Sequence, residues 1–180
     1  MKDIYTIPTF SKNGALHCVI EIPGGTNKKI EFNAETKTFE IDQRNGTDRI
    51  IPFLPYPANY GFIPSTLSDR SLGGDGDALD ILLISEALPT GTIVEAIPIG
   101  ILKLLDKGEY DYKIICVPRD TKKRIINVTT YTQFLKKYRK AKDIIESWFL
   151  HYDTDGDALI SEGWGDEKEA LEEINKSLNH

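Results

Sequence analysis

The stretch that decides the fold is the apolar middle of the chain, TIVEAIPIGILKLL at residues 92–105 followed by YKIICVP at residues 112–118. Both runs are dominated by β-branched and other apolar residues, which is typical of buried strands. Clusters of Gly, Pro and Asp at turn positions separate these runs from further expected strands at residues 38–41 and 80–84. The sequence therefore predicts a β-rich centre.

Two more strands are expected before this centre, at residues 16–22 and 29–33. The turn sequence PGGTN lies between them, so we expect the two strands to form a hairpin. In the second strand, alternation places two apolar side chains on one face and two charged ones, Lys29 and Glu31, on the other. Charge is therefore concentrated on one side of this strand.

The C-terminal part has the periodicity of helices. From Thr132 onward the apolar residues recur three or four positions apart, namely Phe134, Leu135, Tyr138, Ala141, Ile145, Trp148 and Tyr152. A second helix is expected to begin at Asp166, which can cap it together with Glu169. Its expected core-facing residues are Ala170, Leu171, Ile174 and Leu178. Several strands followed by two helices predict an α+β domain, and the strand-rich part has the size of a small closed β-barrel.

Composition limits the possible functions. With 180 residues, 40% of them hydrophobic, the chain can bury one substantial core, so we expect one domain over residues 1–180. A net charge of −6 argues against nucleic acid as a partner. Neither an N-terminal signal sequence nor an apolar run of membrane-spanning length is present, which predicts no membrane partner. Cys18 and Cys116 lie in apolar strands and suit a reducing cytoplasm.

The densest group of acids is in GGDGDALDILLI at residues 73–84, where Asp75, Asp77 and Asp80 follow one another closely. A divalent cation would offset their repulsion, because hard ions such as Mg²⁺ take oxygen ligands and glycines let the loop fold around them. A solvated Asp-Gly turn is the alternative, since both residue types dominate turns. Asp80 favours the cation, because it opens an apolar strand in which a carboxylate needs a partner.

Two other segments carry candidate functional residues. The junction at residues 100–113 holds Asp106, Asp111 and Lys113, although an ordinary polar hairpin has the same composition. The proline-stiffened segment PYPANYGFIP at residues 55–64 offers the hydroxyl groups of two tyrosines, and it also reads as a rigid loop that lines the core.

Together these segments resemble family I of the soluble inorganic pyrophosphatases, from about Leu16 to Trp164. The family signature Asp-x-Asp-x-x-Asp stands here as DGDALD at residues 75–80. The other matches, in chain order, are the strand with Glu21, Lys29-x-Glu31, Tyr56-Pro-x-Asn-Tyr60-Gly61, and Asp106 with Asp111 and Lys113. The resemblance implies an OB-like closed barrel with two C-terminal helices packed on it. It also implies an inorganic diphosphatase that hydrolyses the phosphoanhydride of pyrophosphate to two orthophosphates.

The resemblance implies a role for each matched residue. The metal ligands would be Glu31, Asp75, Asp80, Asp106 and Asp111. The phosphate oxygens would be held by Lys29, an arginine, Tyr60, Lys113 and Tyr152. Asp77 and Tyr60 would be the catalytic residues, with Asp77 assisting as general base, and Glu21 and Tyr56 would support the direct ligands from behind. Several Mg²⁺ ions per site are implied, with Mn²⁺ or Co²⁺ as possible substitutes.

The chemistry of the substrate agrees with these roles. Pyrophosphate carries several negative charges that repel an anionic nucleophile, so catalysis must neutralise the substrate and supply hydroxide near neutral pH. Bound cations do both, because they also lower the pKa of water. The sequence has no Gly-x-Ser-x-Gly motif and no Walker loop. Direct attack by a metal-activated water is therefore the simplest mechanism.

The chain departs from the family pattern at two positions. Arg44 and Arg49 both lie where the family has one arginine; Arg49 is preferred because it follows an Asp and precedes two isoleucines. Asp153 follows Tyr152 where the family often has a lysine, so one phosphate-binding cation is missing.

The acidic segment at residues 153–162 superficially resembles an EF-hand calcium loop. It lacks the glycine at the sixth loop position and the glutamate at the twelfth, which are Ala158 and Trp164 here. We therefore interpret it as a solvated acidic turn.

The sequence is also compatible with two other classes of function. A small barrel can bind single-stranded nucleic acid or an oligosaccharide, although the dense aspartates oppose nucleic acid. A calcium-binding regulatory protein could use both Asp-Gly-Asp segments without turnover. The family resemblance also implies a homo-oligomer.

Overall fold

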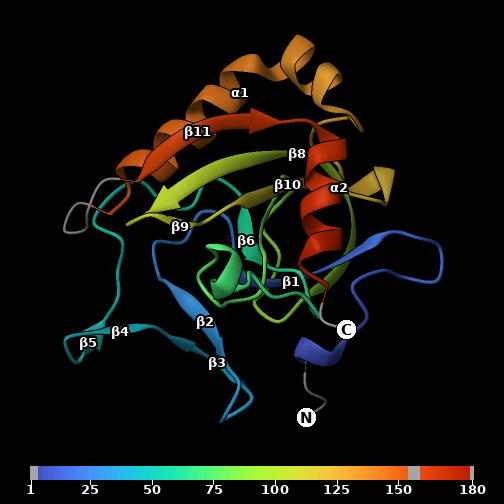
Figure 1. Ribbon diagram of the computed structural model, residues 1–180. Coiled ribbons are helices and arrows are strands. Elements are labelled where there is room, and N and C mark those ends of the chain that lie inside the picture. Colours follow the sequence, from blue (N-terminus) through green and yellow to red (C-terminus); the bar gives the residue numbers. More distant parts are fainter. Residues whose placement is uncertain (1–3, 154–158, 179–180) are drawn as a thin grey trace.

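The computed structural model describes residues 4–153 and 159–178, and Figure 1 shows the arrangement of its elements. The longer strands are β1 (Leu16–Ile22), β2 (Ile30–Asn33), β3 (Thr38–Ile41), β6 (Asn59–Phe62), β7 (Asp80–Leu83), β8 (Ile93–Asp106), β10 (Lys113–Pro118) and β11 (Ile160–Gly165). Short strands are β4 (Gln43–Arg44), β5 (Thr47–Asp48) and β9 (Glu109–Tyr110). The α-helices are α1 (Tyr131–His151) and α2 (Glu167–Lys176), and three 3₁₀ turns are η1 (Ile4–Thr6), η2 (Arg70–Leu72) and η3 (Thr121–Lys123).

The strand pairing closes into a ring. β1 pairs with β6, β6 with β7, β7 with β10, β10 with β8, and β8 again with β1. Only the β7–β10 pair is parallel among these. β8 is long enough to pair with β1 near its start, with β10 in its middle and with β11 near its end. The expected small closed barrel in an α+β fold is thus confirmed.

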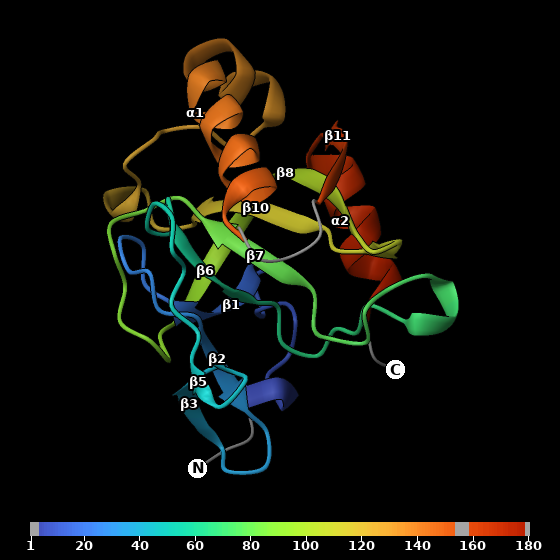
Figure 2. The same cartoon turned by 90° about the vertical axis from the view of Figure 1, so that its left-hand side faces the viewer.

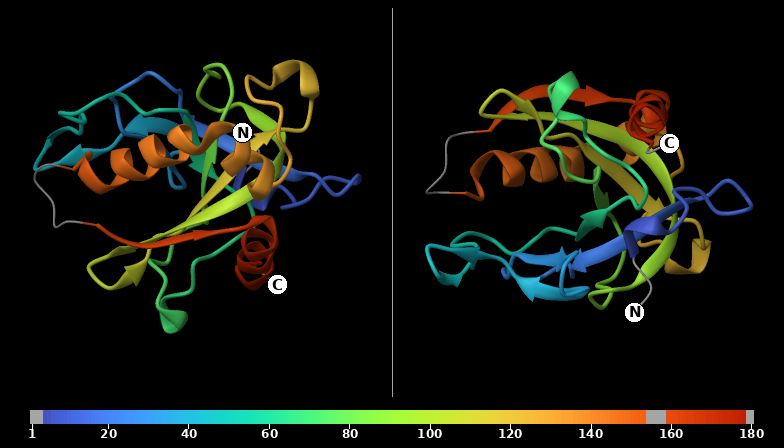
Figure 3. Two further views of the ribbon diagram at one scale, coloured as in Figure 1. Left: turned by 90° about the horizontal axis from the view of Figure 1, so that it is seen from above. Right: turned by 60° about the horizontal axis from the view of Figure 1, so that its bottom comes forward.

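Each central strand buries both of its faces, and the two faces meet different helices. Leu82 and Ile115 belong to the apolar cluster that contains Phe134 and Trp148 of α1. The neighbouring side chains, Ile81 and Ile114, belong to the cluster that contains Ala170 and Ile174 of α2. Figure 3 shows α1 lying against the curved strands of the barrel, with α2 near the C-terminus. Because side chains alternate along a strand, the residues that open β7 and β10 face the α1 side.

The helices begin close to where the sequence predicts. The Thr130 side chain caps α1 by accepting the N–H of Gln133, and Asp166 caps α2 as expected. Glu169, however, does not complete a capping box, because its carboxylate is paired with Lys103 of β8. Leu171 is 38% exposed rather than buried, since only Ala170 and Ile174 of α2 are fully covered by the barrel. No described helix combines the length and the apolar composition needed to cross a membrane.

Three features of the sheet differ from the expectation. β1 forms no hairpin with β2, because the neighbours of β1 are β6 and β8, and β2 pairs with β3 instead. The resulting β2–β3 hairpin lies on the opposite side of the barrel from α1 in Figures 1 and 2. β6 forms within the segment for which flanking prolines predict a rigid loop. β11, which lies between the two helices, carries glycines and little alternation, so its sequence gives a weak strand signal.

The two cysteines lie where the sequence predicts. Cys18 of β1 and Cys116 of β10 are free and fully buried, and both belong to the apolar cluster on the α2 side of the barrel. They are small apolar components of the core.

Candidate active site

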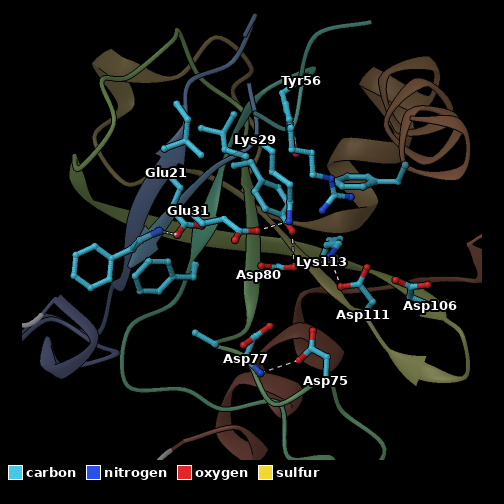
Figure 4. Close-up of a pocket in the computed structure, with 18 of the residues that line it drawn as sticks. Glu21, Lys29, Glu31, Tyr56, Asp75, Asp77, Asp80, Asp106, Asp111 and Lys113 are labelled. Carbon is cyan, nitrogen blue, oxygen red and sulfur yellow. Dashed lines mark hydrogen bonds and ion pairs between the residues drawn. The ribbon is translucent and has the colours of Figure 1, made fainter. Parts of the chain in front are cut away.

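A cavity of about 510 Å³ lies on the α1 side of the barrel, where β7 and β10 begin. All the site residues proposed from the sequence line it. They are Glu21, Lys29, Glu31, Arg49, Tyr56, Tyr60, Asp75, Asp77, Asp80, Asp106, Asp111, Lys113 and Tyr152. Figure 4 shows the labelled carboxylates facing one space from several segments of the chain. Arg44, the alternative to Arg49, does not line this cavity.

The loop with Asp75 and Asp77 is fixed by its main chain. The carbonyl of Ser68 accepts the N–H of Gly76 at 2.8 Å, and the Ser68 N–H donates to the carbonyl of Asp77 at 2.7 Å. Gly76 has a φ of 87°, which glycine adopts without strain. A Cβ on Gly74 would lie 2.3 Å from the Ser68 hydroxyl, so the close approach also requires a glycine there. These contacts hold both aspartates toward the cavity.

The pair Asp80 and Lys113 lies at the centre of the site. The two residues are opposite each other in the parallel β7–β10 register, and the Lys113 ammonium donates to Asp80 at 2.5 Å and also to Asp111. The Tyr60 hydroxyl donates to the same Asp80 oxygen at 2.5 Å. Lys113 is only 3% exposed; burial lowers its pKa, but the two carboxylates outweigh burial and raise the pKa above its ordinary value. The ammonium is therefore charged at neutral pH.

Burial also determines the protonation state of Tyr60. It raises the pKa of Tyr60 well above the ordinary range, and the negative charges of Asp80 and Asp111 raise it further. Tyr60 is therefore a hydrogen-bond donor at any pH near neutrality.

The second acidic segment reaches the same space through the short β8–β9 hairpin. Asp106 ends β8 opposite Glu109 of β9, and Asp111 follows that hairpin. The N–H of Tyr110 donates to the carbonyl of Gly73 at 2.7 Å, which ties the hairpin to the Asp75 loop. This link brings together acids that are about 30 residues apart in the sequence. The two acidic segments thus lie together because their main chains are hydrogen-bonded to each other.

Glu21 is a buried carboxyl group at the back of the cavity. It is 8% exposed, and its side chain accepts the N–H of Phe32 at 2.8 Å. Burial raises the pKa of Glu21 to about 8, while the Phe32 hydrogen bond opposes the rise and the charges of Asp80 and Glu31 add to it. The Glu31 carboxylate of β2 is ion-paired with Lys29, which lies just before that strand.

Asp77 differs from Asp80 and Asp111 because its side chain is open to the cavity and forms no ion pair within residues 4–153 and 159–178. Partial burial raises its pKa, and the nearby charges of Asp75 and Glu31 raise it further, whereas Arg70 and Lys29 oppose the rise. A carboxylate with a raised pKa is a stronger base, and this one faces the space where a substrate would lie.

The aromatic side of the cavity is built by α1. The Trp148 ring stacks on Tyr152 with centroids 4.8 Å apart and lies 4.6 Å from the ring of Tyr56. The Trp148 indole N–H donates to the carbonyl of Leu54 at 2.8 Å, which fixes the ring. Both tyrosines are therefore held in place by packing against one tryptophan.

Three residues with polar or charged side chains line the cavity although the sequence does not predict them there: Tyr5, Arg70 and Glu109. Glu109 could have been found from its place between Asp106 and Asp111 in the sequence. Arg70 comes from η2, and its guanidinium packs over Gly76, where a Cβ would lie 2.2 Å from Nε. Its position depends on how the Asp75 loop folds back, for which the sequence has no local signal.

The donor set suits a hard cation. Glu31, Asp75, Asp80, Asp106 and Asp111 offer only carboxylate oxygens, the ligands that Mg²⁺ prefers. Within the described ranges of the chain, no three acidic, histidine or cysteine side chains are already grouped tightly enough to hold one ion. The Lys113 ammonium bridges Asp80 and Asp111 instead. The sharing of one ion by Asp75, Asp80 and Asp111 stays a prediction.

Part of the acidic segment at residues 153–162 lies outside the described residues, so its interpretation as a solvated turn is not tested at residues 154–158. Asp153, the first residue of this segment, is ion-paired with Arg44 and Arg49, and Trp164, which follows the segment, belongs to β11.

Comparison with known proteins agrees with the site. The family described as inorganic pyrophosphatase matches residues 18–180. An inorganic pyrophosphatase of Neisseria meningitidis is 39% identical over 169 residues, 92% of this chain and 88% of the relative. Solved inorganic pyrophosphatases from Neisseria gonorrhoeae and Thermus thermophilus superpose with TM-scores of 0.82 and 0.83 at 36% and 30% identity, each alignment covering 98% of this chain and 97% of the other. The chain therefore belongs to family I of the inorganic pyrophosphatases, the hydrolases that split pyrophosphate into two phosphates.

Proposed function

We propose that this chain hydrolyses pyrophosphate in a magnesium-dependent reaction, by direct attack of water on one phosphorus atom. The observation that carries the proposal is that one cavity is lined by five potential metal-binding carboxylates together with Lys29, Arg49 and Lys113. Acids alone would repel a polyanion, and cations alone would not supply hydroxide at neutral pH. The combination suits a substrate that arrives with metal ions.

The family resemblance implies two overlapping groups of carboxylates in the cavity. We propose that Asp75, Asp80 and Asp111 hold the tightest ion, and that Asp106, Glu31 and Asp111 face ions that accompany the substrate. Mg²⁺, or Mn²⁺ or Co²⁺ in its place, would neutralise the phosphate oxygens and lower the pKa of the attacking water. Glu21 and Tyr56 are proposed to support this set from behind: both are buried and line the cavity, and Tyr56 packs against Tyr60, which donates to Asp80.

Asp77 is the proposed general base. Its carboxylate is open to the cavity and its pKa is raised, so it can accept the proton that the attacking water loses. As the oxygen–phosphorus bond forms, the bond from that phosphorus to the bridging oxygen breaks. The bridging oxygen leaves with the second phosphate.

Lys29, Arg49, Lys113, Tyr60 and Tyr152 are proposed to hold the phosphate oxygens. The ammonium of Lys113 now spans Asp80 and Asp111, and it can turn to a phosphate oxygen once those carboxylates have other partners. Tyr60 keeps its proton because of its raised pKa and can donate a hydrogen bond as charge gathers on the leaving phosphate. The chain thereby offers donors on several sides of the substrate.

We extend the proposal to the setting of the enzyme. One domain over residues 1–180 carries the whole site, and the two free, buried cysteines support a cytoplasmic location. The family resemblance supports a homo-oligomer, which sedimentation of the purified protein would measure.

The test is phosphate release from pyrophosphate by the purified protein with and without Mg²⁺. We expect release that stops when a chelator is added and falls at least a hundredfold in Asp77→Ala. Asp143→Ala is the matched control, because Asp143 of α1 does not line the cavity and forms its ion pairs with the helix lysines Lys140 and Lys142. No release by the wild-type protein would refute the proposal, and binding of Ca²⁺ without any turnover would favour a regulatory calcium-binding protein instead.

A further inference from the structure

Four charged side chains form a cluster at the edge of the cavity. The two terminal nitrogens of Arg49 bind different carboxylates: Nη1 donates to Asp42 at 3.2 Å and Nη2 donates to Asp153 at 3.1 Å. Arg44 binds the other side of this arrangement, with both of its terminal nitrogens on Asp153 at 3.2 and 2.8 Å. We call Asp42, Arg44, Arg49 and Asp153 the arginine clamp.

The clamp connects parts of the chain that are far apart in sequence. Asp153 follows the end of α1 and directly succeeds Tyr152, which lines the cavity. Arg44 belongs to the β4–β5 hairpin, which lies beside that end of α1 in both views of Figure 3. Of these four residues only Arg49 lines the cavity. Asp42 and Asp153, which bind Arg49, therefore act on a substrate through it.

We propose that Asp153 and Arg44 are positioning residues for substrate binding, with Asp153 holding Arg49 in place and Arg44 keeping the clamp neutral. This inference depends on the proposed function of the cavity. Arg49 is only 17% exposed at its side chain and is fixed at two nitrogens, so its planar guanidinium has little freedom to turn away from the cavity. Such preorganisation reduces the loss of conformational entropy that substrate binding must offset.

The charges explain why a second arginine is needed. Asp42 and Asp153 together would outweigh the one positive charge of Arg49 and leave a net negative group beside an anionic substrate. Arg44 brings the sum of the four formal charges to zero. Because the Arg44 side chain is the most exposed of the four at 42%, its effect on the substrate is a field through solvent and should weaken in salt.

The experiment compares kcat and KM for pyrophosphate at saturating Mg²⁺ in four variants. Asp153→Asn removes one of the two ion pairs of Arg49. We expect KM to rise about fivefold to tenfold while kcat changes less than about twofold. Asp153→Glu keeps the carboxylate and should recover most of the affinity. Arg44→Gln should raise KM about threefold at low salt and much less at about 0.5 M salt. Asp48→Asn is the control, because Asp48 lies in the same hairpin but its side chain accepts a hydrogen bond from Gln43.

A second measurement tests the positioning role by binding alone, without turnover. Calorimetric binding of methylenediphosphonate, which is not hydrolysed, should show the same order of affinities as KM. If the wild type hydrolyses pyrophosphate but Asp153→Asn keeps the wild-type KM and the wild-type affinity for the diphosphonate, the positioning role is refuted while the function stands. Equal losses in Asp153→Asn and Asp153→Glu, accompanied by a lower melting temperature in both, would also refute it in favour of a purely structural role. Absence of turnover in the wild type would refute the function itself.

Discussion

The floor and the rim of the cavity are built in different ways. The floor consists of Asp75, Asp77, Asp80, Asp106 and Asp111, and it is placed by main-chain pairing of β7 with β10 and of the Asp75 loop with Ser68 and Tyr110. The rim consists of Lys29, Arg49 and Tyr152. Its main chain is also paired, since the Lys29 N–H donates to the Arg49 carbonyl at 3.0 Å, but the charged ends of Lys29 and Arg49 are held by ion pairs and the Tyr152 ring by stacking on Trp148. Arg49, for example, depends on an ion pair with a residue 104 positions away.

This difference predicts what each part controls. Main-chain pairing in a buried sheet fixes the floor closely, which suits groups that must be aligned in the transition state. Ion pairs at a partly exposed rim adjust to their surroundings and are screened by salt. We therefore expect changes in the floor to act on turnover, and changes in the rim to act on substrate affinity.

The largest expected effect is that of Asp80→Asn in the floor. The variant keeps the shape of the side chain but removes the charge that Lys113 and Tyr60 now share, so we expect kcat to fall about a thousandfold. Phosphate release at saturating pyrophosphate and Mg²⁺ measures this. A fall in affinity alone, with kcat near that of the wild type, would contradict the assignment of turnover to the floor.

The next effect concerns Glu21, which lies behind both parts. Its folded pKa of about 8 is above its ordinary value of 4.5, so the folded protein retains a proton that the unfolded chain loses. Glu21 therefore lowers the stability progressively as the pH rises from 4.5, and the penalty is complete above about pH 8. In the presence of a chelator, the free energy of unfolding of Glu21→Gln should be higher than that of the wild type by roughly 2–4 kcal/mol at about pH 8.5. Near about pH 4.5 the two free energies should be equal.

Urea unfolding of both proteins across this pH range checks the prediction. The amide oxygen that Glu21→Gln introduces can still accept the Phe32 N–H, so the variant removes the charge while keeping the hydrogen bond. A stability difference that does not vary with pH would show that the Glu21 carboxyl group titrates normally in the folded protein.

Of the three effects compared here, the smallest is expected for Arg49→Lys at the rim. Lysine keeps the positive charge but cannot bind two carboxylates with a planar fork, so the contacts to Asp42 and Asp153 cannot both be kept. We expect KM for pyrophosphate to rise about tenfold, with kcat reduced much less. An equal fall in kcat would show that Arg49 acts mainly in the transition state, and the contrast between rim and floor would then fail.

The floor could be predicted from the sequence because its signal is local. Asp75, Asp77 and Asp80 lie together beside glycines and an apolar strand, and the family resemblance joined them to Asp106 and Asp111. The barrel could be predicted for a similar reason, since the strands of its centre are strongly apolar.

The features that could not be predicted depend on choices between distant partners. Alternation along β1 shows that it is a strand but not that it pairs with β6 and β8 instead of β2. The prolines beside β6 predicted a rigid loop, although this segment forms a strand that closes the ring. The pairing of Asp153 with two arginines had no signal at all, because a charged residue in a polar segment looks the same with or without a partner. The position of Arg70 could not be predicted for the same reason.

The most direct test of the account is a double-mutant cycle on Mg²⁺ binding with Asp75→Asn and Asp111→Asn. If acids from these separate segments share one ion, either substitution should remove most of that site, and the double variant should lose less binding free energy than the sum of the single losses, by at least about 1 kcal/mol. Calorimetric titration of the four proteins with Mg²⁺ measures this directly. Losses that add within about 0.5 kcal/mol would mean that Asp75 and Asp111 bind cations independently, and the shared site would be refuted.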